Sequence, residues 1–402
     1  MMLLGSLEMV RIRAARFARP INKALIVRDV VLVGCGQVSR GRIVPALKLL
    51  AGESVLVLRH VVDIVPLGEM ASALADFAPL QPRYHRIAPQ PGSLARLLQQ
   101  QEFASAAVIV ATPTPWHVDH ACAALAAGCP VALEKPLGAS TEALEELARC
   151  LEHHDARLFF PLGYYLIEKG LPLLALARSG RLTPAQLDCL QGLAANDWSQ
   201  LRSELGAVSS VTGMLREGPD ERGWVHSDGA GGHTLETFSH LVAMVLPWID
   251  ELVMEEAAIG FTLQGGGARS ETTIFARFRG PAGAAVRLAC QKDCPSHLRQ
   301  RWLRIGFERG SAVMDLESGR LTVDAGGLSR SARLSCTVKY EPQLRAFAEK
   351  VAAPDTPTEY AIGRRSVTIS IAVRKQALAL GLCVLEPAWV DQKMRQGEED
   401  DN

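Results

Sequence analysis

Residues 107–137, AVIVATPTPWHVDHACAALAAGCPVALEKPL, hold the pattern that decides the fold. They consist of an apolar strand, a Thr-Pro loop, an Ala-rich helix and a second apolar strand that ends at Glu134-Lys135-Pro136. Short runs that are apolar on both faces are typical of parallel strands covered by helices. Open sheets of this kind bind ligands beyond the carboxyl ends of their strands. We therefore expect Lys135 to lie in a ligand crevice.

The same alternation of strand and helix repeats on both sides of this stretch. A Gly-rich turn at 34–39 follows the first expected strand, and a helical pattern then runs to Leu50. Parallel strands that alternate with helices predict a doubly wound α/β domain. Its strands are expected at 28–33, 55–65, 107–110, 131–133 and 157–162.

A different pattern follows residue 165. Helical segments are expected near 170–180 and 233–247. Apolar runs joined by short turns come next, and consecutive strands with short connections form an antiparallel sheet. These runs are 254–263, 271–279, 284–291, 301–307, 311–315 and 320–324. With closing helices at 341–352 and 360–381, they predict an α+β domain with a large, mostly antiparallel sheet.

The expected boundaries divide the chain into four parts. Residues 1–27 form a basic extension, 28–163 the first domain, 164–388 the second domain, and 389–402 a polar tail. The extension lacks the long apolar run and the small-residue cleavage site of a signal peptide. An organelle transit peptide, an upstream start with Met9 as the true beginning, and a short docking arm are left open.

The composition limits the classes of function. The 43 Lys and Arg residues balance 43 Asp and Glu residues, so net charge does not indicate nucleic acid or a lipid surface as a partner. No apolar run is long enough to cross a membrane. The nine cysteines are scattered, which is typical of reduced thiols in a cytoplasmic protein.

The turn GCGQVS at 34–39 approaches the dinucleotide fingerprint GxGxxG/A. The first glycine makes the tight turn, and the second lets a pyrophosphate approach the backbone. Ser39 takes the third glycine's place and is small enough for close helix packing. The alternative is a glycine turn that binds nothing.

Asp63 follows the second strand, where a carboxylate can accept hydrogen bonds from an adenosine ribose. It lies 27 residues after Gly36, more than the usual spacing of about 20. The next three residues, Ile-Val-Pro, offer no positive charge for a 2′-phosphate, so NAD is favoured over NADP. The alternative is a turn or helix-capping aspartate.

The loop at 111–117 is expected to face the nicotinamide side of such a cofactor. His117 and His120 are three residues apart, as in some metal pairs, but no third ligand is near in sequence, and no metal site is predicted. The predicted cofactor-binding residues are Gly34, Gly36, Gln37, Val38, Asp63, Ala111, Thr112, Pro113, His117, Glu134 and Lys135.

Candidate catalytic groups come from both halves of the chain. Lys135 can hold a substrate oxygen and help to move its proton, and burial would lower its pKa. In the stretch GGHTLETFSH at 231–240, Glu236 and His240 are spaced i,i+4, with His233 one turn earlier. A neighbouring carboxylate orients an imidazole and raises its pKa, as an acid/base pair requires. Helix capping and a zinc site are the alternatives.

Taken together, these motifs resemble the Gfo/Idh/MocA oxidoreductase family, the glucose–fructose oxidoreductase and inositol dehydrogenase group. The resemblance runs from about Val30 to about Leu380. It rests on GCGQVSRGRIVPAL at 34–47, the stretch from Ala111, EKP at 134–136, the GG-x4-E-x3-H stretch at 231–240 and F-x-x-x-V after Leu344.

The resemblance implies an NAD(P)-dependent hydride transfer involving a secondary alcohol or ketone carbon of a sugar, cyclitol or sugar nucleotide. Lys135 matches the family's EKP lysine, and His240 matches its frequent general base. Glu236 stands where the family commonly has Asp. Tyr164, in the pair Tyr164-Tyr165, is a second candidate acid, and Trp224 is a candidate wall of the pocket.

The family also implies a homodimer or homotetramer formed through the sheet of the second domain. Two other functions are left open. One is a non-catalytic dinucleotide-binding relative that acts as a sensor or binds a partner. The other is a zinc hydrolase built on His233, Glu236 and His240.

Overall fold

The first domain of the computed structural model is a six-stranded parallel sheet in the order β3-β2-β1-β4-β5-β6. The structure describes residues 29–163, 170–178, 190–191, 195–218, 231–263, 269–292, 294–334, 340–352, 360–381 and 387–395. The strands are β1 Asp29–Val33, β2 Val57–Asp63, β3 Arg83–Arg86, β4 Ala107–Val110, β5 Val131–Leu133 and β6 Phe159–Pro161. The order reverses between β1 and β4, and this switch point opens a crevice at the strands' carboxyl ends.

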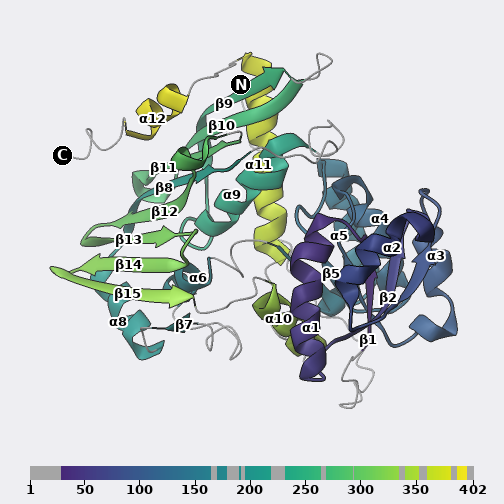
Figure 1. Ribbon diagram of the computed structural model, residues 1–402. Coiled ribbons are helices and arrows are strands. Elements are labelled where there is room, and N and C mark those ends of the chain that lie inside the picture. The colour runs from purple at the N-terminus through teal and green to yellow at the C-terminus, as the bar shows by residue number, and fades with distance from the viewer. Residues whose placement is uncertain are drawn as a thin grey trace.

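Helices cover both faces of this sheet (Figure 1). They are η1 Ser39–Ile43, α1 Val44–Gly52, α2 Leu67–Leu74, α3 Ser93–Leu98, α4 His117–Ala126 and α5 Thr141–His153, with short turns η2 Ala75–Phe77, η3 Gln101–Phe103, η4 Thr114–Trp116 and η5 Ala156–Leu158. Val31 and Val33 face the layer of α3, α4 and α5, whereas Val30 and Leu32 face α1 and α2. This two-sided burial explains why the strands are apolar throughout. The doubly wound domain is confirmed; β3 was not predicted because its sequence, RYHR, is polar.

The second domain is built on a nine-stranded sheet in the order β7-β15-β14-β13-β12-β8-β11-β10-β9. Its strands are β7 Leu190–Gln191, β8 Val208–Arg216, β9 Val253–Leu263, β10 Arg269–Arg279, β11 Ala285–Gln291, β12 Gln300–Phe307, β13 Gly310–Asp315, β14 Arg320–Ala325 and β15 Leu328–Leu334. Only β8 and β11 pair in parallel, so the mostly antiparallel sheet is confirmed. The sequence prediction missed β7, β8 and β15.

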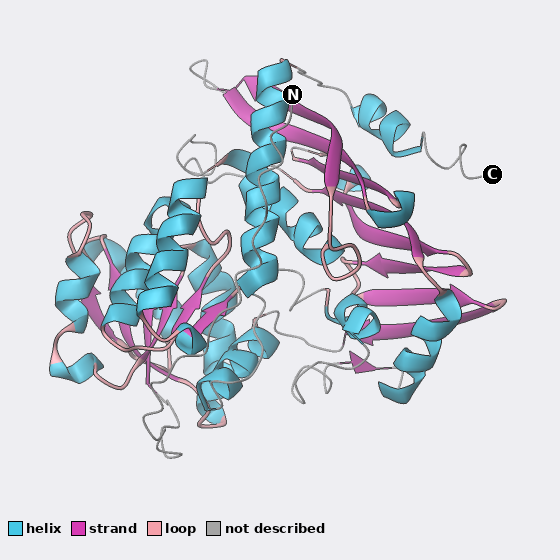
Figure 2. Cartoon of the chain, turned by 180° about the vertical axis from the view of Figure 1, so that it is seen from behind, coloured by secondary structure: helices cyan, strands magenta, loops and turns pink. Residues whose placement is uncertain are grey.

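One face of the large sheet packs against helices, and the long helix α11 lies between this sheet and the first domain (Figures 1 and 2). The helices of this domain are α6 Leu171–Arg178, α8 Ala195–Leu205, η8 Thr234–Phe238, α9 Ser239–Val245 and α11 Tyr360–Leu380, with short turns η9 Pro281–Gly283 and η10 Ser296–Leu298. We call the face toward α9 and α11 the inner face.

Helix α10, Glu341–Ala352, returns to the first domain, although its residues were assigned to the second. Tyr340, Leu344 and Phe347 are buried in the core that contains α1. The ring centroids of Phe347 and Phe160 lie 6.0 Å apart. The apolar stripe of α10 thus packs against α1 and Phe160 of the first domain, and a domain boundary at one point in the sequence cannot represent this return.

Helix α12, Pro387–Arg395, lies on the outer face of the large sheet, where a polar tail was expected from residue 389. Val390 is fully buried, and the ring of Trp389 meets that of Phe275 edge-on with centroids 5.6 Å apart. Asp391 pairs with the buried Arg216 at 2.6 Å. The tail prediction was wrong for this segment because its few apolar residues fall on one side of a helix. No helix in the described part of the chain is long and apolar enough to span a membrane.

Candidate active site

The Gly-rich turn forms the floor of a crevice at the carboxyl ends of β1 and β4. Gly34 has φ +92°, and a Cβ placed there would lie 2.6 Å from the carbonyl oxygen of Ala111, so only glycine fits. A Cβ on Gly36 would meet no protein atom within 4 Å, which leaves its backbone open to a ligand. Ser39 donates its hydroxyl to the carbonyl of Gly34 at 2.5 Å. The residue at the third fingerprint position thus connects the start of the helix to the Gly-rich turn through a hydrogen bond.

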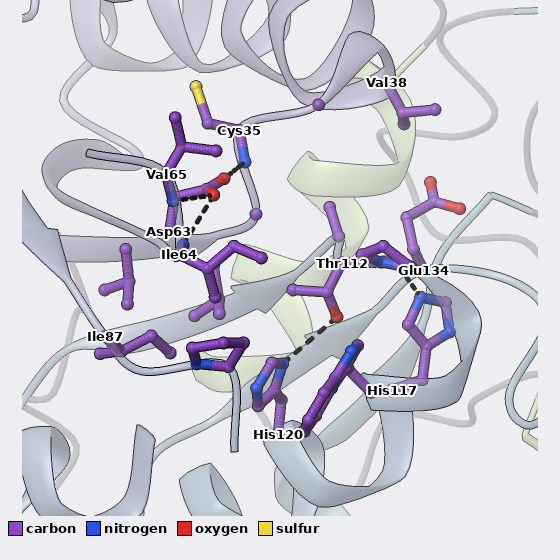
Figure 3. A pocket seen from close by; sticks show the side chains of 18 of the residues that line it. Cys35, Val38, Asp63, Ile64, Val65, Ile87, Thr112, His117, His120 and Glu134 are labelled. Carbon is purple, nitrogen blue, oxygen red and sulfur yellow. Dashed lines mark hydrogen bonds between the residues drawn. The ribbon is translucent and has the colours of Figure 1, made fainter. Parts of the chain in front are cut away.

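Asp63 closes one end of this crevice (Figure 3). Its Oδ2 accepts the N–H of Cys35 at 2.6 Å, and its Oδ1 accepts the N–H groups of Ile64 and Val65 at 2.7 and 3.1 Å. Although Asp63 lies 27 residues after Gly36, its carboxylate still contacts the Gly-rich turn. A carboxylate has about four acceptor sites, so it can also receive a ribose hydroxyl.

The crevice has a volume of about 320 Å³. All of the predicted cofactor-binding residues line it, together with Trp116, His120 and Ile87, which were not predicted. An open glycine backbone at a helix start, opposite a carboxylate at the end of the second strand, fits a dinucleotide with its pyrophosphate at the turn and a ribose at Asp63.

His117 and His120 stabilise the walls of the crevice. The two ring nitrogens of His117 each lie 2.7 Å from a carbonyl oxygen, that of Pro136 and that of Thr112. His120 Nδ1 lies 3.2 Å from Thr112 Oγ1, its ring stacks on Trp116, and burial lowers its pKa to about 4. Within the described residues, no three His, Cys, Asp or Glu side chains gather as a metal site would require.

Glu134 anchors the EKP segment from behind. Its buried carboxylate accepts the backbone N–H of Lys135 at 2.9 Å and the hydroxyl of Tyr340. Burial raises the pKa of Glu134. Because Tyr340 precedes α10, the return of that helix to the first domain also fixes the position of Lys135.

Lys135 joins the two domains at the inner end of the crevice. Its Nζ lies 2.8 Å from Glu236 Oε1 and 2.8 Å from the backbone oxygen of Glu236. The two side chains are 12% and 10% exposed, so the pair is largely desolvated. Glu236 was expected to orient His240, and that role stays a prediction; its carboxylate also forms an ion pair with Lys135 that the sequence did not predict.

His240 is buried, with 5% of its surface exposed. Burial, followed by the positive charge of Lys135, lowers its pKa well below the usual value. The expected net rise of this pKa is not found: Glu217 acts to raise it, but desolvation and the nearby cations outweigh that carboxylate. A neutral imidazole at physiological pH can accept a proton.

A second cavity, of about 450 Å³, adjoins the crevice and contains side chains that sequence reasoning missed. Gln37, Val38, Lys135 and Glu236 line both cavities, and His240 lines the second. The missed residues in its wall are Arg42, Glu217, Lys292, Arg299, Arg301 and Tyr340. Several of these residues lie next to the end of a strand. The strands predicted at 284–291 and 301–307 could therefore have indicated Lys292, Arg299 and Arg301.

The start of the GGHTLETFSH helix is anchored on β10 and α11. Glu271 accepts the backbone N–H and the hydroxyl of Thr234 at 3.1 and 2.8 Å, and Arg374 pairs with it at 2.5 Å. These contacts fix the helix that carries Glu236 and His240. The candidates Tyr164, Tyr165 and Trp224 lie outside the described residues.

Comparisons with known proteins agree with this geometry. Residues 28–161 match the family model described as an oxidoreductase family with an NAD-binding Rossmann fold. A search of curated proteins finds no match.

Solved structures with the same fold include the 3-ketoreductase KijD10 from Actinomadura kijaniata, in complex with NADP and TDP-benzene, at 16% identity and a TM-score of 0.66 over 87% of this chain and 97% of that one. A levoglucosan dehydrogenase in complex with NADH is 16% identical, with a TM-score of 0.67 over 88% and 97%. A putative oxidoreductase from Thermotoga maritima is 15% identical, with a TM-score of 0.63 over 87% and 97%.

Proposed function

We propose that this chain transfers a hydride between nicotinamide and a secondary alcohol or ketone carbon of a polyhydroxylated small molecule, because residues 28–161 match the model of the Gfo/Idh/MocA oxidoreductase family. One observation carries the proposal: the cofactor crevice and the polar second cavity share Lys135 and Glu236. A cofactor in the first and a substrate in the second would meet at the lysine. Sugars, cyclitols and sugar nucleotides are the candidate substrates.

NAD, when bound, accepts or supplies the hydride. The backbone at Gly36 would hold its pyrophosphate, and Asp63 would accept hydrogen bonds from its adenosine ribose. The apolar side chains of Ile64 and Val65 offer no positive charge to the 2′-phosphate of NADP, and Ile64 is 47% exposed. The carboxylate of Asp63 would repel that phosphate. NAD is therefore the preferred cofactor over NADP.

His240 is the proposed general base. Its neutral imidazole takes the proton of the substrate hydroxyl as the carbon loses its hydride, and it returns the proton in the reverse reaction. Lys135 holds the reacting oxygen and stabilises the negative charge that develops there. Glu236 keeps the ammonium group of Lys135 in place, which is a positioning role. Tyr164 stays a secondary candidate for the acid.

The test combines cofactor binding with turnover. The purified protein is titrated with NADH, and absorbance at the nicotinamide band is then followed with NAD and a panel of sugars, polyols, cyclitols and their acids. We expect Lys135→Ala to lower kcat by two or more orders of magnitude while the NADH dissociation constant changes little. Wild-type turnover by this variant would refute the role of Lys135. NADH binding without turnover on any compound would favour a non-catalytic relative.

A further inference from the structure

Three neighbouring strands of the large sheet deliver charged side chains to one end of the second cavity. Strand β8 lies between β11 and β12, and Arg216 is in register with both Gln291 and Gln300. Glu217, Lys292 and Arg299 are the next residues beyond these three positions. They all line the cavity, as does Arg301.

Glu217 holds two cations side by side. Its Oε2 lies 2.6 Å from Lys292 Nζ, and its Oε1 lies 3.0 Å from Arg301 Nη2. These two cations hold the pKa of Glu217 well below its usual value although burial acts in the opposite direction. The side chains of Lys292 and Glu217 are 9% and 14% exposed. The cluster is therefore a fixed, partly desolvated group of charges.

Arg299 adds a further cation. A Cβ placed on Gly218 would lie 2.8 Å from Arg299 Cζ, so the absence of a side chain at 218 makes room for the guanidinium. No carboxylate among the described residues forms an ion pair with Arg299. Among the described residues, Glu217 pairs with both Lys292 and Arg301, and Glu317 pairs with Arg301 at 3.1 Å.

Cations outnumber carboxylates among the described residues that line the cavity. Among the described residues that line it, the cations are Arg42, Lys135, Lys292, Arg299 and Arg301, and the carboxylates are Glu217 and Glu236. His240 stays neutral because its pKa is lowered, and the charges of Arg42 and Arg301 contribute to that lowering. A neutral polyol needs hydrogen bonds but not an excess of positive charge. Guanidinium and ammonium groups in a concave site bind carboxylates and phosphates strongly.

We propose that the substrate carries an anionic group, a carboxylate or a phosphate, which binds at Lys292, Arg299 and Arg301 while its reacting carbon lies at Lys135 and His240. This inference rests on the proposed function, because it assigns the substrate class of the same site. The residues at the ends of β8, β11 and β12 then determine substrate specificity. They select an acidic or phosphorylated sugar over its neutral counterpart.

The test compares ligands that share one sugar ring and differ in charge. D-glucose, D-glucuronate and D-glucose 6-phosphate are titrated calorimetrically into the NADH-loaded protein at low and high salt. We expect at least one of the two anions to bind about tenfold or more tightly than glucose, and this advantage to shrink with salt. The two anionic arms distinguish a carboxylate site from a phosphate site.

Arg299→Gln is expected to reduce the ratio of anion to glucose affinity by about tenfold, and Arg299→Lys to restore part of it. Arg304→Gln is the matched control, because Arg304 lies on β12, the strand that Arg299 directly precedes, but is exposed on the outer face. Equal binding of all three sugars, or a ratio that Arg299→Gln leaves unchanged, would overturn the anionic-substrate proposal while NADH binding and turnover still supported an oxidoreductase. Failure to bind NADH would instead argue against the proposed function. In that case, titration of the three sugars into the protein without NADH would test the anion site on its own.

Discussion

The ammonium group of Lys135 lies 2.8 Å from the carboxylate of Glu236, across the boundary between the two domains. The lysine ends a strand of the parallel sheet, and the glutamate lies on η8, more than one hundred residues later in the chain. The pair lines both the crevice of the first domain and the charged second cavity. A ligand that occupies both cavities would therefore contact this pair.

Replacing Glu236 tests this contact. Glu236→Gln keeps the size of the side chain but leaves Lys135 without a charged partner in a largely desolvated site, so we expect kcat to fall tenfold or more and Tm to fall by several degrees. Steady-state kinetics and thermal unfolding measure both. Glu102→Gln, which breaks the exposed pair with Arg83, should change neither. Unchanged kinetics in Glu236→Gln would exclude a positioning role.

A pair of glycine variants tests the dinucleotide site. Gly34→Ala forces a side chain against the carbonyl of Ala111 at a positive φ, and we expect about 2–4 kcal/mol loss in the free energy of unfolding. The Cβ added by Gly36→Ala would meet no protein atom within 4 Å, so the protein should keep its stability. The same Cβ would hinder the pyrophosphate, and NADH affinity should fall at least tenfold. Urea unfolding and NADH titration separate the two effects. Normal NADH binding by Gly36→Ala would place the pyrophosphate elsewhere.

Cofactor preference depends on the end of β2. Asp63→Ser combined with Ile64→Arg removes the carboxylate that would repel a 2′-phosphate and adds a cation at an exposed position. We expect the preference for NAD over NADP to reverse, as measured by the ratio of their dissociation constants. Because Asp63 also accepts the N–H of Cys35, a lower Tm should accompany the change. A ratio that stays in favour of NAD would show that discrimination lies at another position.

The pH dependence of oxidation reports on His240. Burial and Lys135 lower its pKa well below 6.5, so the imidazole stays neutral, and able to accept a proton, down to a pH below that value. The profile of kcat/KM for alcohol oxidation should therefore be flat between pH 8 and about 6.5 and fall only in more acidic solution. A profile that already falls with an apparent pKa near 7 would exclude His240 as the base.

The stability of the protein should also fall in acid. His120 has a pKa of about 4 in the folded state and about 6.5 when unfolded, so the unfolded state binds more protons between these values. Its contribution to stability is present above pH 6.5 and is lost as the pH falls toward 4. Urea unfolding at several pH values measures this slope. In His120→Asn the slope should be smaller, and an identical slope would contradict the assignment.

The sequence alone determined most of the first domain and many of the residues that line its crevice. The apolar runs at 107–110 and 131–133 are strands to the residue, because burial on both faces requires continuous apolar character. The Gly-rich turn, Asp63 and EKP were predictable since each follows a strand of one parallel sheet, and that topology brings strand ends together. Local sequence contains all of this information.

Only the tertiary structure decided the contacts between distant segments. The i,i+4 spacing indicated His240 as the partner of Glu236, and only the packing of η8 against the first domain shows that the carboxylate also forms an ion pair with Lys135. The cluster around Glu217 likewise depends on β8, β11 and β12 being neighbours in matching register. Register and partner choice come from long-range burial and pairing, which no local pattern encodes, and so the charge of the second cavity emerged only when the sheet was assembled.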